Sequence, residues 1–205
     1  MKKVALTFDV GHPDQPHSDP HAVLTVLDHL ERAAVQGTFF LQGFWAGAYP
    51  RQAEKIAAAG HLIGVHSHWH APYDYLTEEG VNDDLERSRK AVLDATGRDP
   101  RPWLRLPYGS GATDEELLAR LARLGYMSVY WNVDPRDWDP NSSARVVASS
   151  VIDGVSRLTG PAVALFHGWS IFTMTALPWI INDLSAQCEF VMVDYFDHQW
   201  LSSCR

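Results

Sequence analysis

Short apolar runs alternate along the chain with longer segments in which apolar residues recur at every third or fourth position. Short runs rich in β-branched and aromatic residues are typical of buried strands, whereas the wider spacing is typical of amphipathic helices. The short runs predict strands at residues 4–10, 38–41, 61–65, 103–106, 126–133, 162–166 and 189–193. The segments between them predict helices at residues 20–34, 51–59, 79–95, 113–124, 142–158 and 176–186.

Capping residues mark several of the predicted helix ends. Thr77 precedes one helix and Gly97 follows it, and Thr113 opens a capping-box sequence whose helix stops before Gly125. Repeated strand–helix alternation indicates an α/β architecture with a mostly parallel sheet, but it does not distinguish an open sheet from a barrel. No internal repeat or linker interrupts the pattern, so we predict a single domain over residues 1–205.

Composition narrows the possible classes of function. The 205 residues carry a net charge of −8, which argues against a general affinity for nucleic acid. No run of about 20 apolar residues is present, so we expect no membrane span. The N-terminus lacks a signal-peptide pattern, so we expect a cytoplasmic protein, with a trimmed secreted protein as the alternative. Cys188 and Cys204 are expected to be free thiols, although a disulfide between them is an alternative. The sequence does not indicate an oligomeric state.

Candidate catalytic side chains stand where the predicted strands end. The carboxyl ends of parallel strands lie at one edge of a sheet, and ligands of α/β proteins bind there. The residues at these ends are Asp9, His66, Arg105, Asp134, Asp137 and His167. His66 begins the sequence His-Ser-His-Trp-His, in which His66 and His70 could reach one metal ion if the chain turns sharply after the strand.

Five short motifs in this order resemble those of the polysaccharide deacetylase family, the NodB-homology domain of carbohydrate esterase family 4. They are Thr7-Phe8-Asp9-Val10-Gly11, His66-Ser67-His68-Trp69-His70, Arg105-Leu106-Pro107-Tyr108-Gly109, Asp134-Pro135-Arg136-Asp137-Trp138 and Leu165-Phe166-His167. The resemblance spans residues 4 to about 193. Each motif alone is weak, but five in order are specific.

The resemblance implies a distorted (β/α)7-type barrel and a divalent metal bound by His66 and His70. Zinc is the expected metal, with cobalt or nickel as alternatives. Asp9 would act as general base toward a metal-activated water, and His167 would act as general acid toward the leaving group. Arg105 would hold Asp9 ionised and oriented, and Asp137 would raise the pKa of His167.

The same resemblance implies residues that contact the substrate. The backbone N–H of Tyr108 would stabilise the oxyanion, and Trp138 and Leu165 would form walls of a small apolar pocket for the acetyl methyl. For Trp138, core packing and an exposed platform for a sugar ring are alternatives. The implied substrate is an acetylated oligosaccharide or polysaccharide.

Val10 departs from the family pattern, in which this position holds an acidic third metal ligand. Valine has no ligating atom, and two neutral imidazoles leave the charge of the ion uncompensated. Asp14 is the first candidate to replace the missing ligand, followed by His12 and His17. Alternatively, Asp9 itself binds the metal, or the metal is lost together with activity.

The remaining polar residues of the motifs are expected to have supporting roles. We expect His68 not to bind the metal, Ser67 to hydrogen-bond a ligand histidine, and Asp134 to cap the loop before Pro135. The other histidines are expected at the surface: His12, His17, His21, His29, His61 and His198.

The function that these residues favour is metal-dependent removal of N-acetyl groups, or of O-acetyl groups, from a carbohydrate. Two alternatives stay open. One is a weakened or non-catalytic homologue that binds sugar, and the other is a small-molecule amide hydrolase of the same superfamily. Substrate specificity depends on loops that a single sequence does not decode.

Overall fold

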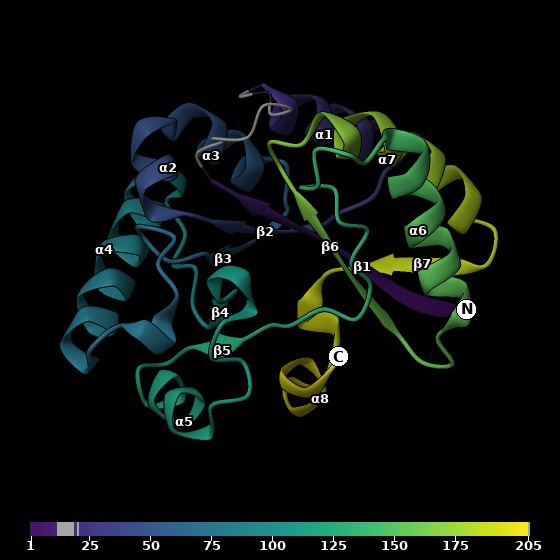
Figure 1. The fold of residues 1–205 in the computed structure, drawn as a ribbon. Coiled ribbons are helices and arrows are strands. Elements are labelled where there is room, and N and C mark those ends of the chain that lie inside the picture. The colour runs from purple at the N-terminus through teal and green to yellow at the C-terminus, as the bar shows by residue number, and fades with distance from the viewer. Residues whose placement is uncertain (12–18, 20, 205) are drawn as a thin grey trace.

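A curled parallel sheet forms the centre of the computed structural model, which describes residues 1–11, 19 and 21–204 (Figure 1). Its strands are β1 (Lys2–Val10), β2 (Thr38–Leu41), β3 (Leu62–Val65), β4 (Trp103–Leu104), β5 (Met127–Ser128), β6 (Ala162–His167) and β7 (Cys188–Val191). The main order is β5-β4-β3-β2-β1-β6. The sheet therefore forms a half-barrel of the (β/α) type, which agrees with the predicted α/β class and barrel.

Two irregularities shape the half-barrel. β7 pairs with residues 2–5 of β1, whereas β2 pairs with residues 7–10, so the two strands follow each other along one edge of β1. On the other side, the chain after β5 crosses to β6, where Val133 forms an isolated bridge with Ala164. The predicted strand at 126–133 is therefore wrong beyond Ser128. There the side chain of Asn132 makes hydrogen bonds to the backbone at the start of β6. It accepts from Val163 N and donates to Pro161 O.

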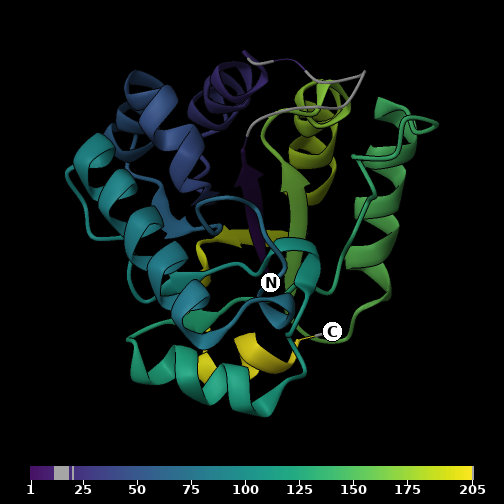
Figure 2. The same ribbon diagram turned by 60° about the vertical axis from the view of Figure 1, so that its left-hand side comes forward.

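The helices surround the outer face of the sheet, except α8, which packs against the concave side (Figures 1 and 2). They are α1 (Ala22–Arg32), α2 (Gly43–Ala48), α3 (Pro50–Ala58), α4 (Glu78–Thr96), α5 (Glu115–Arg123), α6 (Ala144–Arg157), α7 (Ile171–Leu184) and α8 (His198–Ser203), with 3-10 turns at Tyr73–Tyr75, Pro107–Gly109 and Val193–Tyr195. α8 lies beside α5 at the lower end of Figure 2. Leu201 of α8 packs into a small apolar cluster on the concave side of the sheet, separate from the main core under the other helices.

Caps explain where most of the helices begin and end. Thr77 accepts a hydrogen bond from Gly80 N at the start of α4, and Gly97 ends that helix with a φ of 70°. Asp114, rather than the predicted Thr113, caps α5. Ser170 caps α7, which therefore begins five residues before the predicted residue 176. α2 was not predicted, because six residues including two glycines carry too little periodicity.

The alternation of β1 decides which residues reach the site. Leu6, Phe8 and Val10 pack into the main core beneath the helices. Thr7 and Asp9 point to the concave side, where both contact Arg105. Val10, at 2% exposure, is thus a core residue on the opposite face from Asp9.

Two findings concern the described residues as a whole. Cys188 and Cys204 are buried and are not joined by a disulfide. Within the described part of the chain, no helix is both long and apolar enough to cross a membrane.

Candidate active site

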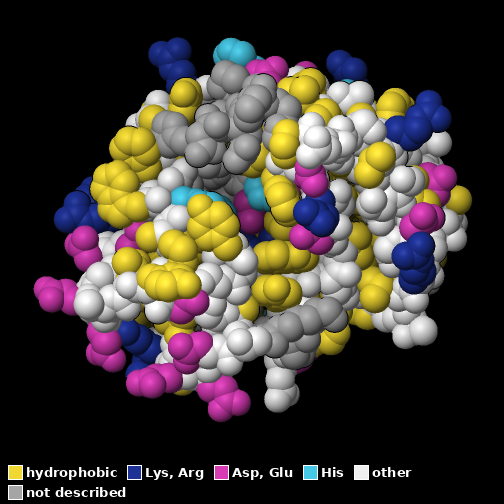
Figure 3. All heavy atoms as spheres, viewed as in Figure 1, with side chains coloured by type: hydrophobic (Ala, Val, Ile, Leu, Met, Phe, Trp, Pro, Cys, Tyr) yellow, Lys and Arg dark blue, Asp and Glu magenta, His cyan; other side chains and the backbone are white. Residues whose placement is uncertain are grey.

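The predicted site residues come together at the carboxyl ends of the strands. Asp9 pairs in register with His167 of the neighbouring strand β6, so the two side chains leave adjacent strands at the same level. His66 follows β3 directly and Arg105 follows β4 directly. Figure 3 looks onto a hollow in which histidine and acidic side chains are visible, with hydrophobic side chains gathered around it.

Arg105 is fully buried and organises this end of the sheet. Its Nη1 lies 3.3 Å from Asp9 Oδ1, its Nη2 donates to Thr7 Oγ1 at 3.1 Å, and its Nε donates to the carbonyl of Val129 at 2.7 Å. The guanidinium also lies over the ring of Phe40, at 4.5 Å from the ring centre. The contact expected between Arg105 and Asp9 is therefore present, and Arg105 is a buried cation with specific partners.

His66 is tied to the same arginine through the backbone. Its Nδ1 lies 2.9 Å from the carbonyl oxygen of Arg105, and because a carbonyl only accepts, Nδ1 carries the proton. Burial lowers the pKa of His66, and the nearby Asp9 carboxylate offsets this only in part. Burial and the neighbouring His66 lower the pKa of His70 to about 3. Both rings are therefore neutral at pH 7, and Nε2 of His66 is a bare acceptor.

Two histidine nitrogens, Nε2 of His66 and Nε2 of His70, are close enough to bind one divalent cation. Nε2 of His66 lies 3.1 Å from Nε2 of His70, close to the separation of about 3.4 Å expected for two imidazole nitrogens on one tetrahedral zinc. Oδ2 of Asp9 lies 3.6 Å from the same His66 nitrogen. Without a cation, Nε2 of His70 can donate to the bare Nε2 of His66 at this distance, so shared binding of a cation requires the His70 tautomer with its proton on Nδ1.

A complete metal-binding group is not formed by the described residues. Across residues 1–11, 19 and 21–204, no three His, Cys, Asp or Glu side chains converge closely enough to hold an ion. Val10 supplies no ligand, because valine has no ligating atom, and its side chain is buried in the core. The suggested replacements, His12, Asp14 and His17, lie outside the described residues.

His167 forms the second half of the site with Asp137. Its Nδ1 donates to Asp137 Oδ1 at 2.7 Å, and its backbone N–H donates to Oδ2 of the same carboxylate at 2.8 Å. Thr173 also donates to Oδ2, and Asp137 is fully buried. Burial lowers the pKa of His167, but the charge and hydrogen bond of Asp137 outweigh burial, so the pKa is raised overall. Nδ1 is held, which leaves Nε2 as the nitrogen able to exchange a proton with a substrate.

Sequence reasoning missed the residue that holds the histidine loop, 66–70. Asp84 of α4 is 3% exposed and accepts hydrogen bonds from His68 N at 2.8 Å, from Trp69 N at 3.1 Å and from Tyr73 Oη at 2.6 Å. Its place in the helix was a usable signal, because it follows Val81 by three residues and so falls on the buried face. Ser67 Oγ accepts from His70 N at 2.7 Å, so Ser67 hydrogen-bonds one of the two candidate ligand histidines, as expected, through its backbone.

Of the predicted substrate-contacting residues, Tyr108 lies beside the imidazole pair. Tyr108 is largely exposed, and its ring lies 4.6 Å from that of His70. Leu165 is buried on β6, two residues before His167. Trp138 is 38% exposed and stacks against the guanidinium of Arg136 at 4.9 Å. Asp134 accepts from Arg136 N, so it caps its own loop as predicted.

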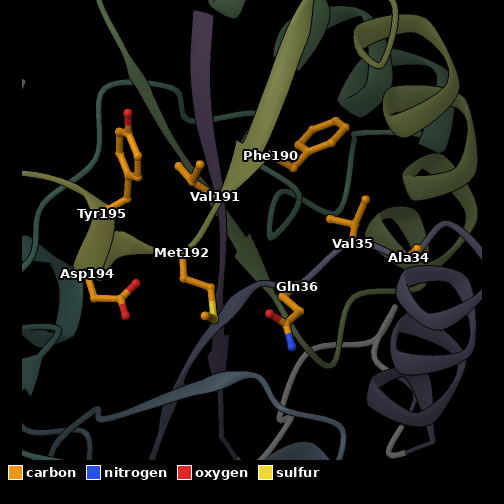
Figure 4. Close-up of a pocket in the computed structure, with 8 residues that line it drawn as sticks. All are labelled: Ala34, Val35, Gln36, Phe190, Val191, Met192, Asp194 and Tyr195. Atoms are coloured by element: carbon orange, nitrogen blue, oxygen red, sulfur yellow. The ribbon is translucent and has the colours of Figure 1, made fainter.

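Two other features lie outside this site. His61, expected at the surface, is buried and accepts from Gly37 N, and burial lowers its pKa to about 4. His21 and His198 are exposed and His29 is half-buried. A separate pocket is formed by residues 34–36, before β2, and by residues 190–192, 194 and 195, at and after the end of β7 (Figure 4). It contains none of the predicted site residues.

Comparisons with known proteins agree with these motifs. A family model described as polysaccharide deacetylase matches residues 1–129. The peptidoglycan N-acetylmuramic acid deacetylase PdaA of Bacillus subtilis is 31% identical over 187 residues, which cover 91% of this chain and 67% of that protein.

Solved structures show the same fold. A family 4 carbohydrate esterase from Streptomyces lividans, in complex with acetate, is 28% identical with a TM-score of 0.80, and the match covers 94% of this chain and 93% of that one. A CE4 family pseudoenzyme from Bacillus anthracis is 25% identical with a TM-score of 0.83, and the match covers 95% of this chain and 64% of that one.

Replacing Asp84 tests its role in holding the histidine loop. Asp84→Ala removes three hydrogen bonds to a buried carboxylate, so we expect the free energy of unfolding to fall by about 2–4 kcal/mol. Tyr73→Phe removes only one of these bonds and should cost about 1 kcal/mol. Urea unfolding measures both values. Equal losses for the two variants would contradict the role assigned to the two loop N–H groups.

Proposed function

The chain belongs to the polysaccharide deacetylase family, and on that premise we propose that it removes N-acetyl groups from an acetylated glycan by hydrolysis. The observation that supports this most directly is that histidines of lowered pKa and a histidine of raised pKa lie in the same site. A neutral imidazole pair lies beside the Asp9–Arg105 ion pair, and a histidine of raised pKa lies on the next strand in register with Asp9.

The residues divide the work of amide hydrolysis between them. His66 and His70 would hold the divalent cation, which when bound supplies Lewis acidity toward the acetyl carbonyl and the attacking water. Asp9 accepts the proton of that water, and Arg105 keeps the carboxylate oriented toward the site. His167 donates a proton from Nε2 to the departing amine nitrogen, which is a poor leaving group unless it is protonated.

The surrounding residues position the acetyl group. The backbone N–H of Tyr108 is proposed to donate to the developing oxyanion. Trp138 and Leu165 are proposed to form the apolar walls that receive the acetyl methyl. In this proposal the scissile carbon lies between the side chains of Asp9 and His167. These two residues are paired in register on the adjacent strands β1 and β6.

Acetate release tests the proposed function directly. Purified protein supplied with zinc, cobalt or nickel should release acetate from acetylated chitooligosaccharide or peptidoglycan fragments. His66→Ala and His70→Ala should each bind metal more weakly and lose acetate release by about 100-fold or more, since each removes one of two ligands. His21→Ala, at an exposed histidine, is the matched control. Absence of acetate release under all three metals would refute the proposal.

The acid role of His167 predicts a particular pH profile. The acid must be protonated, so activity falls as pH rises through the pKa of His167, which Asp137 raises. Asp137→Asn removes that charge, so the fall in kcat should move to lower pH. NMR titration of the His167 ring should show a lower pKa in the same variant. An unchanged alkaline limb would exclude His167 as the acid.

One observation favours a second candidate function. Val10 stands where the family has an acidic ligand, and a pseudoenzyme occurs among the solved structures with the same fold. The second candidate is therefore a sugar-binding homologue without catalysis. It predicts glycan binding that a chelator does not affect and that His66→Ala does not change.

Substitution at Val10 tests whether this position acts on a bound metal. Without metal, Val10→Asp buries a carboxylate in an apolar core and should lower the free energy of unfolding by about 1–3 kcal/mol. If the new carboxylate reaches the imidazole pair, zinc should raise the Tm of the variant more than that of the wild type. Val10→Asn, which is similar in size but neutral, should gain less from zinc. Equal zinc responses in all three proteins would show that this position does not act on the metal.

A further inference from the structure

Two large aromatic side chains are exposed beside the imidazole pair. Phe44, in the first turn of α2, is 47% exposed, and Trp69, in the histidine loop, is 56% exposed. Their ring centres are 5.2 Å apart and the planes are inclined by 36°. Together they form a small apolar surface, here called the Phe44–Trp69 platform, which no role described above uses.

Buried contacts hold the backbone of the platform in place. Trp69 N donates to Asp84, and Phe44 N donates to the carbonyl of His68. Gly43 N donates to the carbonyl of Ser67, and a Cβ at Gly43 would lie only 2.5 Å from His68 Nδ1. The start of α2 is therefore packed directly onto the histidine loop, and the two rings are fixed relative to His70.

The platform borders the site through the histidine loop. Trp69 directly precedes His70 in the chain, and the ring of His68 contacts that of Trp69 at 4.5 Å. The ring of His70 contacts that of Tyr108. The histidine loop and the loop after β4 therefore each carry an exposed aromatic side chain. Figure 3 shows hydrophobic side chains gathered around the hollow.

We propose that the Phe44–Trp69 platform binds a pyranose ring of the substrate chain adjacent to the sugar that is deacetylated. A pyranose presents apolar C–H faces that stack on aromatic rings, while its hydroxyl edges stay in water. Two rings are far too small for a protein interface, which buries about 1,200–2,000 Å². This inference rests on the proposed function and adds which side chains of this chain hold the sugar next to the one that reacts.

Binding measured in EDTA tests the platform without depending on catalysis. Isothermal titration calorimetry would compare N-acetylglucosamine with tetra-N-acetylchitotetraose and with a peptidoglycan tetrasaccharide. The wild type should bind at least one tetrasaccharide more tightly than the monosaccharide. Trp69→Ala and Phe44→Ala should each weaken that binding by about five- to tenfold, as expected for a lost stacking contact. Trp69→Phe, which keeps an aromatic ring, should retain most of the tetrasaccharide affinity.

Trp179→Ala is the matched control, because Trp179 is 49% exposed on α7 and belongs to no part of the site. With active protein, the platform variants should raise KM for the tetrasaccharide and leave kcat unchanged. Unchanged tetrasaccharide binding in Trp69→Ala, or no tetrasaccharide binding by the wild type, would overturn the inference. Length-dependent binding without acetate release would support the platform and refute the proposed function instead.

Discussion

The buried ion pair between Arg105 and Asp9 is the interaction on which the rest of the site depends. A guanidinium without access to water is tolerated only when its donors and its charge are satisfied. Here Thr7, Asp9 and the carbonyl of Val129 accept from it. Removing one partner of such a pair costs about 3–5 kcal/mol, a large part of the 5–15 kcal/mol that stabilises a typical domain. The same residue fixes His66 through its carbonyl, so the base and the first imidazole share one anchor.

The parallel sheet then brings the two halves of the site together. Asp9 and His167 are 158 residues apart in sequence, yet the β1–β6 register makes them direct neighbours. Their environments differ in charge. Asp9 faces a permanent cation, whereas His167 faces the Asp137 carboxylate, which raises the pKa of His167. In the proposed mechanism Asp9 accepts a proton and His167 donates one, and hydrolysis of an amide requires both transfers.

Much of this arrangement was predictable because strand ends in a parallel sheet share one edge. That rule alone placed Asp9, His66, Arg105 and His167 together. The failures have physical causes. The strand predicted at 126–133 is interrupted because Arg105 and Asn132 take over its hydrogen bonds, and no local pattern reveals such partners. His61 was placed at the surface because its partner, Gly37 N, lies 24 residues away. Asp84 was overlooked because acidic residues in helices are usually exposed, although its position on the apolar face indicated burial.

Val10 lies apart from this arrangement. Buried ion pairs are not needed for stability, since apolar residues of similar volume are often as stable or more so. Arg105, Asp9 and the Asp137–His167 pair are nevertheless all present, hydrogen-bonded and convergent. Val10 belongs to the other face of β1, where it fills the core. The apolar residue at this position therefore leaves the convergence of Asp9, His167 and both imidazoles intact.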